Sequence, residues 1–119
     1  MSYDFRLCDP VSGKTLHTSH NHFICGGTYC IGGTSEMWLN ITYNYSRNYR
    51  KAFKNSMGIQ ILAGKTGAES IPLLKNAISN LSDEVNEDYW TPTEGNAKRA
   101  LYGLLAFAQM RPDGVWDYR

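Results

Sequence analysis

The segment over residues 91–110 constrains the fold most strongly, because it combines a helix start with a long apolar face. The run Thr91-Pro92-Thr93-Glu94 has the composition of a capping box, with Pro92 at the first helical position and Glu94 at the third. A wide apolar face follows at helical spacing: Ala97, Ala100, Leu101, Leu104, Leu105, Phe107 and Ala108. We therefore predict a central core helix over residues 93–110.

Two further amphipathic patterns predict two further helices. The first spans residues 35–54, where these apolar side chains share one face: Met37, Trp38, Ile41, Tyr45, Tyr49 and Ala52. The second spans residues 70–81, with this apolar stripe: Ile71, Leu74, Ile78 and Leu81. An acidic segment over residues 83–88 separates the second helix from the core helix.

The N-terminal residues have the period of a strand. Tyr3, Phe5 and Leu7 alternate with more polar positions, which is typical of a half-buried strand. Residues 9–14 supply Asp, Pro, Ser and Gly for a turn, so a second strand over residues 15–19 would complete a hairpin. A third strand is expected over residues 28–31, because a two-stranded hairpin alone is marginally stable. Trp116 is expected to dock the short C-terminal tail.

These segments predict one α+β domain over residues 1–119, in which a small N-terminal antiparallel hairpin or sheet packs against three α-helices. A chain of 119 residues with 42% hydrophobic and 19% charged residues has the composition of an ordinary globular domain. The net charge of +1 argues against strong non-specific binding to nucleic acid. No apolar run approaches the ~20 residues of a membrane span, and no signal peptide is evident, so we expect a cytoplasmic protein without a membrane partner.

A basic stripe lies opposite the apolar face of the first predicted helix. Arg47, Arg50, Lys51 and Lys54 recur at helical spacing, and Tyr43 projects on the same side. Cations beside an aromatic ring suit a phosphate or an acidic protein surface, although most such stripes are simply solvated. We interpret the stripe as a site for a protein partner. The acidic segment could supply the complementary charge in a homo-oligomer.

A repeated glycine phrase precedes the same helix. Cys25-Gly26-Gly27-Thr28 is followed six residues later by Ile31-Gly32-Gly33-Thr34. If a helix begins there, Gly32, Gly33, Thr34 and Ser35 would present free backbone N–H groups and hydroxyls to an anion. The alternative is that paired glycines only make tight turns. Gly64-Lys65-Thr66 matches just the end of a phosphate-binding loop, and we reject that interpretation.

Histidines and cysteines cluster between residues 17 and 30. Zinc prefers such ligands, so His20, His22, Cys25 and Cys30, with His17 nearby, form a candidate metal site. The spacing lacks the tight Cys-x2-Cys pair of established zinc modules, which favours a polar loop with buried cysteines. No nucleophile elbow or acid–base pair is recognisable, so we expect a protein without catalysis and without a cofactor. An unrecognised enzyme or zinc protein is the third alternative.

Several phrases resemble a set of small uncharacterised proteins encoded by phages, prophages and mobile elements of Gram-positive and gut bacteria. These phrases are Gly26-Gly27-Thr28-Tyr29, Trp38-Leu39-Asn40-Ile41-Thr42-Tyr43, Thr66-Gly67-Ala68-Glu69-Ser70-Ile71-Pro72, Pro92-Thr93-Glu94-Gly95-Asn96-Ala97 and Met110-Arg111-Pro112-Asp113-Gly114. The resemblance implies action in the bacterial host cytoplasm, where such proteins often inhibit host defence. Our leading hypothesis is thus a non-enzymatic protein that binds a bacterial host protein. A small-ligand or nucleotide-signal binding protein is the alternative.

Overall fold

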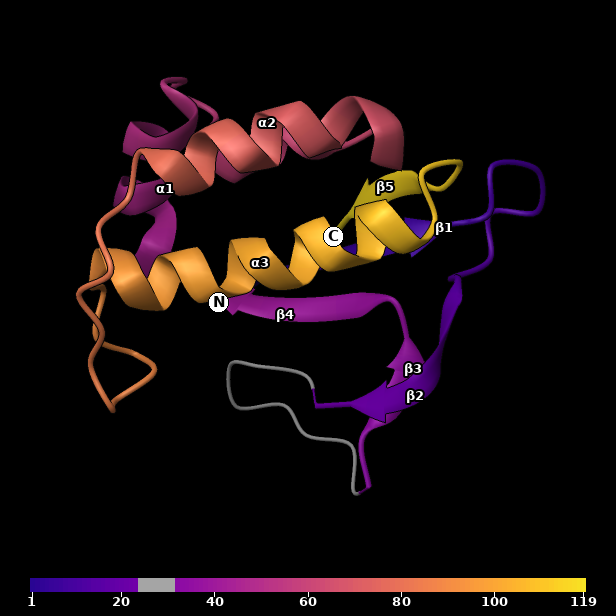
Figure 1. Ribbon diagram of the computed structural model, residues 1–119, viewed down its shortest axis with the longest axis horizontal. Helices are drawn as coiled ribbons and strands as arrows, with labels where there is room; N and C mark the ends of the chain where they lie inside the picture. The colour runs from indigo at the N-terminus through magenta and orange to yellow at the C-terminus, as the bar shows by residue number, and fades with distance from the viewer. Residues whose placement is uncertain (24–31) are drawn as a thin grey trace.

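A computed structural model describes residues 1–23 and 32–119 and gives an α+β fold (Figure 1). The chain order is β1 (Ser2–Cys8), β2 (His17–His22), β3 (Thr34–Glu36), β4 (Trp38–Thr42), the 3-10 helix η1 (Tyr43–Tyr45), α1 (Ser46–Phe53), the 3-10 helix η2 (Gly58–Leu62), α2 (Gly67–Ser79), α3 (Glu94–Met110) and β5 (Val115–Tyr118). The predicted fold class is confirmed.

Strand β1 lies in the middle of a three-stranded antiparallel sheet of order β4-β1-β5. Its alternating pattern is confirmed, since Phe5 and Leu7 are fully buried. The neighbouring strands add Ile41 and Trp116 to the same face, and the helices α2 and α3 cover it (Figure 1). The hydrophobic core therefore lies between one face of this sheet and the helices.

The predicted N-terminal hairpin is only partly right. The turn forms as expected, because the Asp9 carboxylate accepts hydrogen bonds from the backbone N–H groups of Val11 and Ser12, both at 2.9 Å. The two strands then diverge after a single bridge, Cys8 to Thr15. Strand β2 pairs instead with β3, as a separate ribbon that projects from the body (Figure 1). The third strand expected over residues 28–31 lies outside the described residues.

The helix predicted over residues 35–54 is wrong in its first half. Trp38–Thr42 forms β4, which pairs with β1 along its whole length. Aromatic and β-branched residues in this run favour a strand, and pairing with β1 outweighs the helical period of the apolar positions. The helix α1 begins only at Ser46. Its predicted inner face is confirmed there, since Tyr49 and Ala52 are fully buried.

The other two helices are confirmed with shifted starts. Thr66 caps α2 through a reciprocal capping box with Glu69, so α2 begins three residues before Ser70. This cap gives Thr66 of the rejected phosphate loop a structural role. Thr93, rather than Thr91, caps α3, because Thr91 is held in a turn that begins at Asp88.

The C-terminal tail is a strand that locks α2 onto the sheet. The indole Nε1–H of the buried Trp116 donates to the Ser70 hydroxyl at 2.8 Å, and this hydroxyl donates to the Gly67 carbonyl at 2.7 Å. The Gly67 N–H donates in turn to the Gly114 carbonyl at 2.7 Å. The expected docking through Trp116 is thus confirmed, and the first turn of α2 lies directly against the backbone before β5.

This close approach gives the first prediction. A Cβ at Gly67 would lie 2.7 Å from the Arg111 carbonyl oxygen and 3.0 Å from the Pro112 Cα, both of which are backbone atoms. We expect Gly67→Ala to lower the free energy of unfolding by about 1–3 kcal/mol in urea denaturation. Gly103→Ala is the control, because its Cβ would meet only the tip of the Leu39 side chain. It should lower the free energy of unfolding by less than Gly67→Ala does. A gain in stability for Gly67→Ala would contradict the packing described.

Candidate functional site

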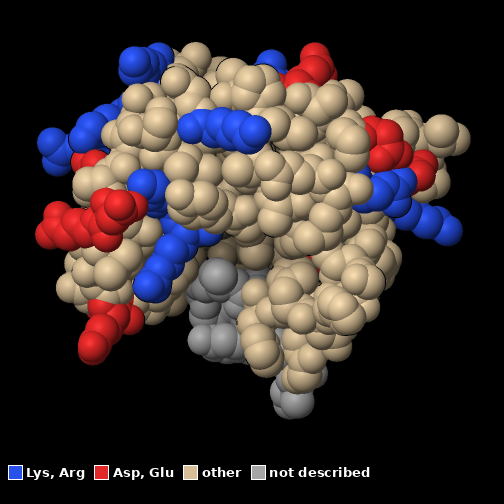
Figure 2. Space-filling model, in the orientation of Figure 1, with Lys and Arg blue, Asp and Glu red and all other residues tan. Residues whose placement is uncertain are grey.

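The predicted basic residues lie on α1 and just beyond its end. Arg47, Arg50, Lys51 and Lys54 are all exposed. Figure 2 shows basic side chains along the upper left edge of the molecule, where α1 lies in Figure 1, with acidic side chains below them. We call these four residues the basic row. Three of them lie on one side of α1 and Lys54 follows at its C-terminal end, so they form one exposed surface as expected.

Tyr43 does not belong to the basic row, so this part of the predicted site is wrong. It lies in η1 rather than in a continuous helix, and its ring packs on Tyr3 with centroids 4.5 Å apart. Its hydroxyl is 3.1 Å from the Tyr118 hydroxyl. This hydrogen bond and partial burial raise the pKa of Tyr43 to about 12. Tyr43 instead belongs to a group of aromatic side chains at the edge of the hydrophobic core.

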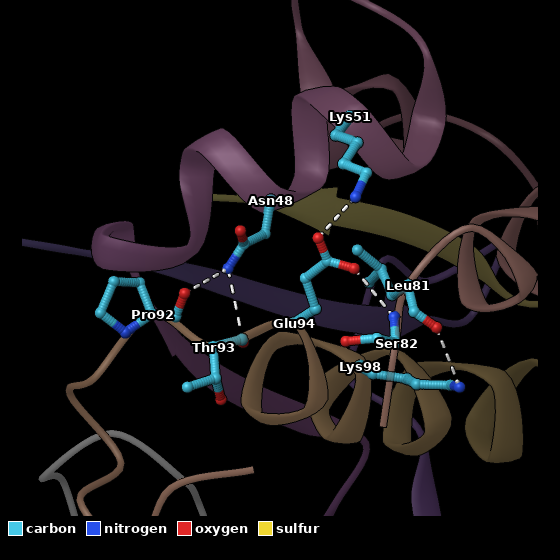
Figure 3. Close-up of polar contacts among 8 residues, drawn as sticks. All are labelled: Asn48, Lys51, Leu81, Ser82, Pro92, Thr93, Glu94 and Lys98. Carbon is cyan, nitrogen blue, oxygen red and sulfur yellow. Dashed lines mark hydrogen bonds and ion pairs between the residues drawn. The ribbon is translucent and has the colours of Figure 1, made fainter. Parts of the chain in front are cut away.

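Residues 82–93, which we call the connector, fold back over α1 and the start of α3. Glu94 links three parts of the chain (Figure 3): its carboxylate accepts from the Lys51 ammonium at 2.5 Å and from the Ser82 N–H at 2.9 Å. The N–H of Gly95 donates to the Glu84 carbonyl at 2.7 Å. Lys98 donates to the Leu81 carbonyl and to Asp83. The predicted acidic segment is therefore an ordered loop rather than a loose linker.

A buried asparagine fixes the inside of the connector. The side-chain amide of Asn96 donates to the carbonyls of Asp88 and Thr91, each at 3.1 Å, and accepts from the Asn86 N–H at 3.0 Å. Asn96 is only 5% exposed, so the interior shields these bonds from water. They satisfy backbone groups that a short irregular loop would otherwise leave unpaired.

Side chains of η1 and α1 hold the other side of the connector. Asn44 donates to the Trp90 carbonyl at 2.9 Å, and Asn48 donates to the Pro92 carbonyl at 3.0 Å. The Tyr45 hydroxyl donates to the Tyr89 carbonyl. The connector is therefore fixed by side-chain amides and a hydroxyl from η1 and α1. Figure 3 shows the contact of Asn48.

Sequence reasoning missed these asparagines. Asn96 lies among apolar positions of α3, and a polar residue on such a face is the one available signal of a buried hydrogen-bonding role. Asn44 and Asn48 carried no comparable signal, because the connector carbonyls that they bind are distant in the chain.

Two hollows flank the connector. One is lined by Asn44, Arg47, Asn48, Lys51, Pro92 and Glu94, and it joins the basic row to the connector. The other lies between the connector and α3, with a volume of about 160 Å³. Its floor includes Tyr45, which is fully buried, and its rim includes the exposed Arg99. The basic row and the second hollow are thus separate features that share the connector.

The anion site predicted at residues 32–35 is not at a helix N-terminus. Thr34 and Ser35 belong to β3, and the Ser35 hydroxyl is hydrogen-bonded to His17 Nδ1 at 2.7 Å. Gly33 has a φ of +81°, and a Cβ there would lie 2.8 Å from the His22 carbonyl oxygen. Gly32 also has a positive φ, of +79°. The glycines therefore serve the turn into the ribbon, as the alternative interpretation proposed, and the helix dipole required for the anion is absent.

The described residues of the metal candidate are partly used in hydrogen bonds. His22 Nε2 lies 2.5 Å from the Glu36 carbonyl oxygen, and its ring packs on Phe107 at 5.2 Å. His20 is exposed. Within residues 1–23 and 32–119, no group of three or more metal-ligating side chains is close enough to hold an ion. Cys25 and Cys30 lie outside the described residues, so the site that includes them stays a prediction.

No family model matches the chain, and no curated protein or solved structure matches it. Among the described residues, no helix has the length and apolar character needed to cross a membrane.

The role of Asn96 gives a second prediction. Asn96→Asp keeps the shape but removes the two N–H donors, so two connector carbonyls lose their partners. We expect the free energy of unfolding to fall by about 1–3 kcal/mol. Backbone amides within residues 86–91 should exchange with deuterium faster than in the wild type. The matched control is Asn76→Asp on the exposed face of α2, and an equal loss in both variants would contradict the role assigned to Asn96.

The ion pair of Glu94 gives a third prediction, on pH dependence. The Lys51 ammonium and the Ser82 N–H hold the pKa of Glu94 below its ordinary value of 4.5. A lowered pKa in the folded state means that Glu94 stabilises the fold above pH 4.5 and loses this effect as the pH falls through the folded-state pKa.

The stability difference between wild type and Glu94→Gln should therefore shrink between about pH 6 and about pH 3 in urea denaturation. Glu84→Gln is the control, because within the described residues the exposed Glu84 side chain forms no ion pair. A pH-independent difference for Glu94→Gln would refute the linkage.

Proposed function

We propose that this chain is a non-enzymatic binding protein whose basic row docks on an acidic surface of a partner protein. One observation carries the proposal. In the part of the chain that the structure describes, Arg47, Arg50 and Lys54 form no ion pair, although they lie on one exposed surface. Three neighbouring cations without internal partners repel one another, and an external acidic surface would relieve this repulsion.

The helix that carries the row is rigidly held, which supports recognition. The Tyr49 hydroxyl donates to the Ala97 carbonyl at 2.9 Å in the interior, and the Asn80 amide donates to the Ala52 carbonyl at 2.9 Å. Lys51 is further restrained by Glu94. A partner that binds this surface therefore does not have to order the backbone of α1, which limits the entropic cost of association.

The surroundings of the row favour a protein over a nucleic acid. The connector next to it carries Asp83, Glu84, Glu87 and Asp88, all exposed. A uniformly charged phosphate backbone that extends past α1 would meet these carboxylates and be repelled. A protein surface can instead place acidic groups over the row and basic groups over the connector. A second copy of this chain has the same mixed charge, so a homodimer is a form of the same proposal.

The bacterial context comes from the resemblance to phage and prophage proteins. On that basis we propose a protein of the bacterial host cytoplasm as the partner. Inhibition of host defence is one function that such binding would serve.

Charge reversal in the row gives the fourth prediction. Arg47→Glu with Arg50→Glu should weaken binding to the partner at least about tenfold, or 1.4 kcal/mol. The melting temperature should stay nearly unchanged, because exposed side chains without ion pairs contribute little to stability. The tagged wild type is first used to capture partners from a bacterial lysate, and the captured protein is then titrated with each variant.

The matched control is Lys14→Glu with Lys75→Glu, which makes the same change in net charge at exposed sites away from the row. The control should bind like the wild type. Undiminished binding by the Arg47/Arg50 variant would disprove the assignment of this surface. Sedimentation of the purified protein tests the homodimer, whose dissociation should depend on the same two arginines.

A further inference from the structure

The hollow between the connector and α3 has the build of a small-ligand site. Its apolar surface is made by the half-buried Tyr89 and by Ala100, which is 7% exposed. Tyr45 packs behind them and is fully buried. Two oppositely charged residues, Glu87 and Arg99, also line it, and both are exposed. The hollow is therefore apolar inside and charged at its rim.

Its size limits the ligand. The volume of about 160 Å³ is close to that of an apolar protein cavity that accepts one benzene molecule, roughly 150 Å³. A single aromatic ring or a branched aliphatic group therefore fills it, whereas a nucleobase with its sugar would not fit inside.

The interior of the hollow offers a ligand apolar contacts rather than hydrogen bonds. The amide of Asn96 is used by the connector, and the Tyr45 hydroxyl donates to the Tyr89 carbonyl. Polar recognition must then come from the rim. Among the described residues, neither Glu87 nor Arg99 is in an ion pair. A carboxylate is the natural partner of a guanidinium, and an ammonium group is the natural partner of a glutamate.

We propose that this hollow binds a free hydrophobic α-amino acid of the size of phenylalanine or leucine. The side chain packs on Tyr89 and Ala100, the carboxylate pairs with Arg99, and the ammonium group pairs with Glu87. Both charges of the zwitterion are used, and the apolar interior selects against small or polar amino acids. This site is distinct from the basic row and does not depend on the function proposed for it.

The test is a titration of isotope-labelled protein followed by amide chemical shifts. L-Phenylalanine should bind with a Kd of about 1 mM or below, as expected for a ligand of its size. The shifts should concentrate at residues 86–89 and 96–100. Glycine has both charges but no side chain, so it should bind at least about tenfold more weakly. No saturable change with phenylalanine up to about 10 mM would overturn the proposal.

Two blocked probes separate a free amino acid from the end of a peptide. N-Acetyl-L-phenylalanine keeps the carboxylate alone, as at a peptide C-terminus, and L-phenylalanine amide keeps the ammonium group alone, as at an N-terminus. Each should bind at least about fivefold more weakly than phenylalanine. Equal binding of either probe would overturn the assignment, since one of the two rim charges would then be unused.

Substitutions at the rim complete the test. Arg99→Gln should weaken the binding of phenylalanine at least about fivefold and leave the binding of phenylalanine amide unchanged. Glu87→Gln should likewise weaken the binding of phenylalanine and leave the binding of N-acetylphenylalanine unchanged. Both positions are exposed, so the fold should tolerate the changes. Arg47→Gln, in the basic row, is the matched control and should bind all probes as the wild type does. Equal losses for all probes in the Arg99 variant would contradict the pairing.

Discussion

Strand β1 is paired along both edges, and this double pairing sets the position of the other elements. Its partners come from opposite parts of the chain: β4 lies about thirty-five residues away and β5 more than one hundred. Because β4 continues directly into η1 and α1, pairing with β1 also places the basic row. Because β5 holds Trp116 against Ser70, the other edge of β1 places α2. The surface features thus follow from the burial of one strand.

The connector is held by a different kind of force. Its backbone has no regular pairing, and it contributes few large side chains to the core. Side-chain amides of Asn44, Asn48 and Asn96 take over the role that backbone partners have in a helix or strand. Hydrogen bonds are directional, so this arrangement fixes the shape of the loop more closely than apolar contacts would. Both the hollow beside the basic row and the hollow above Tyr45 depend on that shape. A change that loosens the connector should therefore alter the two surfaces together.

The sequence was informative wherever the decisive contacts are local. The helices α2 and α3 follow from period, capping threonines and apolar faces, and their interior positions agree with the structure. The segment over residues 35–45 was predicted wrongly because the spacing of its apolar positions is compatible with both a helix and a buried strand. Pairing with the free edge of β1 stabilises the strand, and this contact is distant in the sequence. Arg47, Arg50 and Lys51 lie together on the exposed side of α1, because their spacing of three and four residues holds within this short helix. Tyr43 was misplaced, because it precedes that helix. Asn44 and Asn48 bind connector carbonyls 46 and 44 positions away in the chain, and no local pattern encodes such contacts.

The distance in sequence between β1 and β5 has a consequence for how the protein is made. During synthesis β1 leaves the ribosome before both of its partners, and β4 can pair with it well before β5 because it is much nearer in the chain. The second edge of β1 stays open until residues 115–118 have emerged, since only they supply its partner. Trp116 arrives with them, so the apolar interior beneath Phe5 and Leu7 is incomplete until that moment. A nascent chain therefore exposes an unpaired strand edge until residues 115–118 have emerged, a state that favours contact with chaperones.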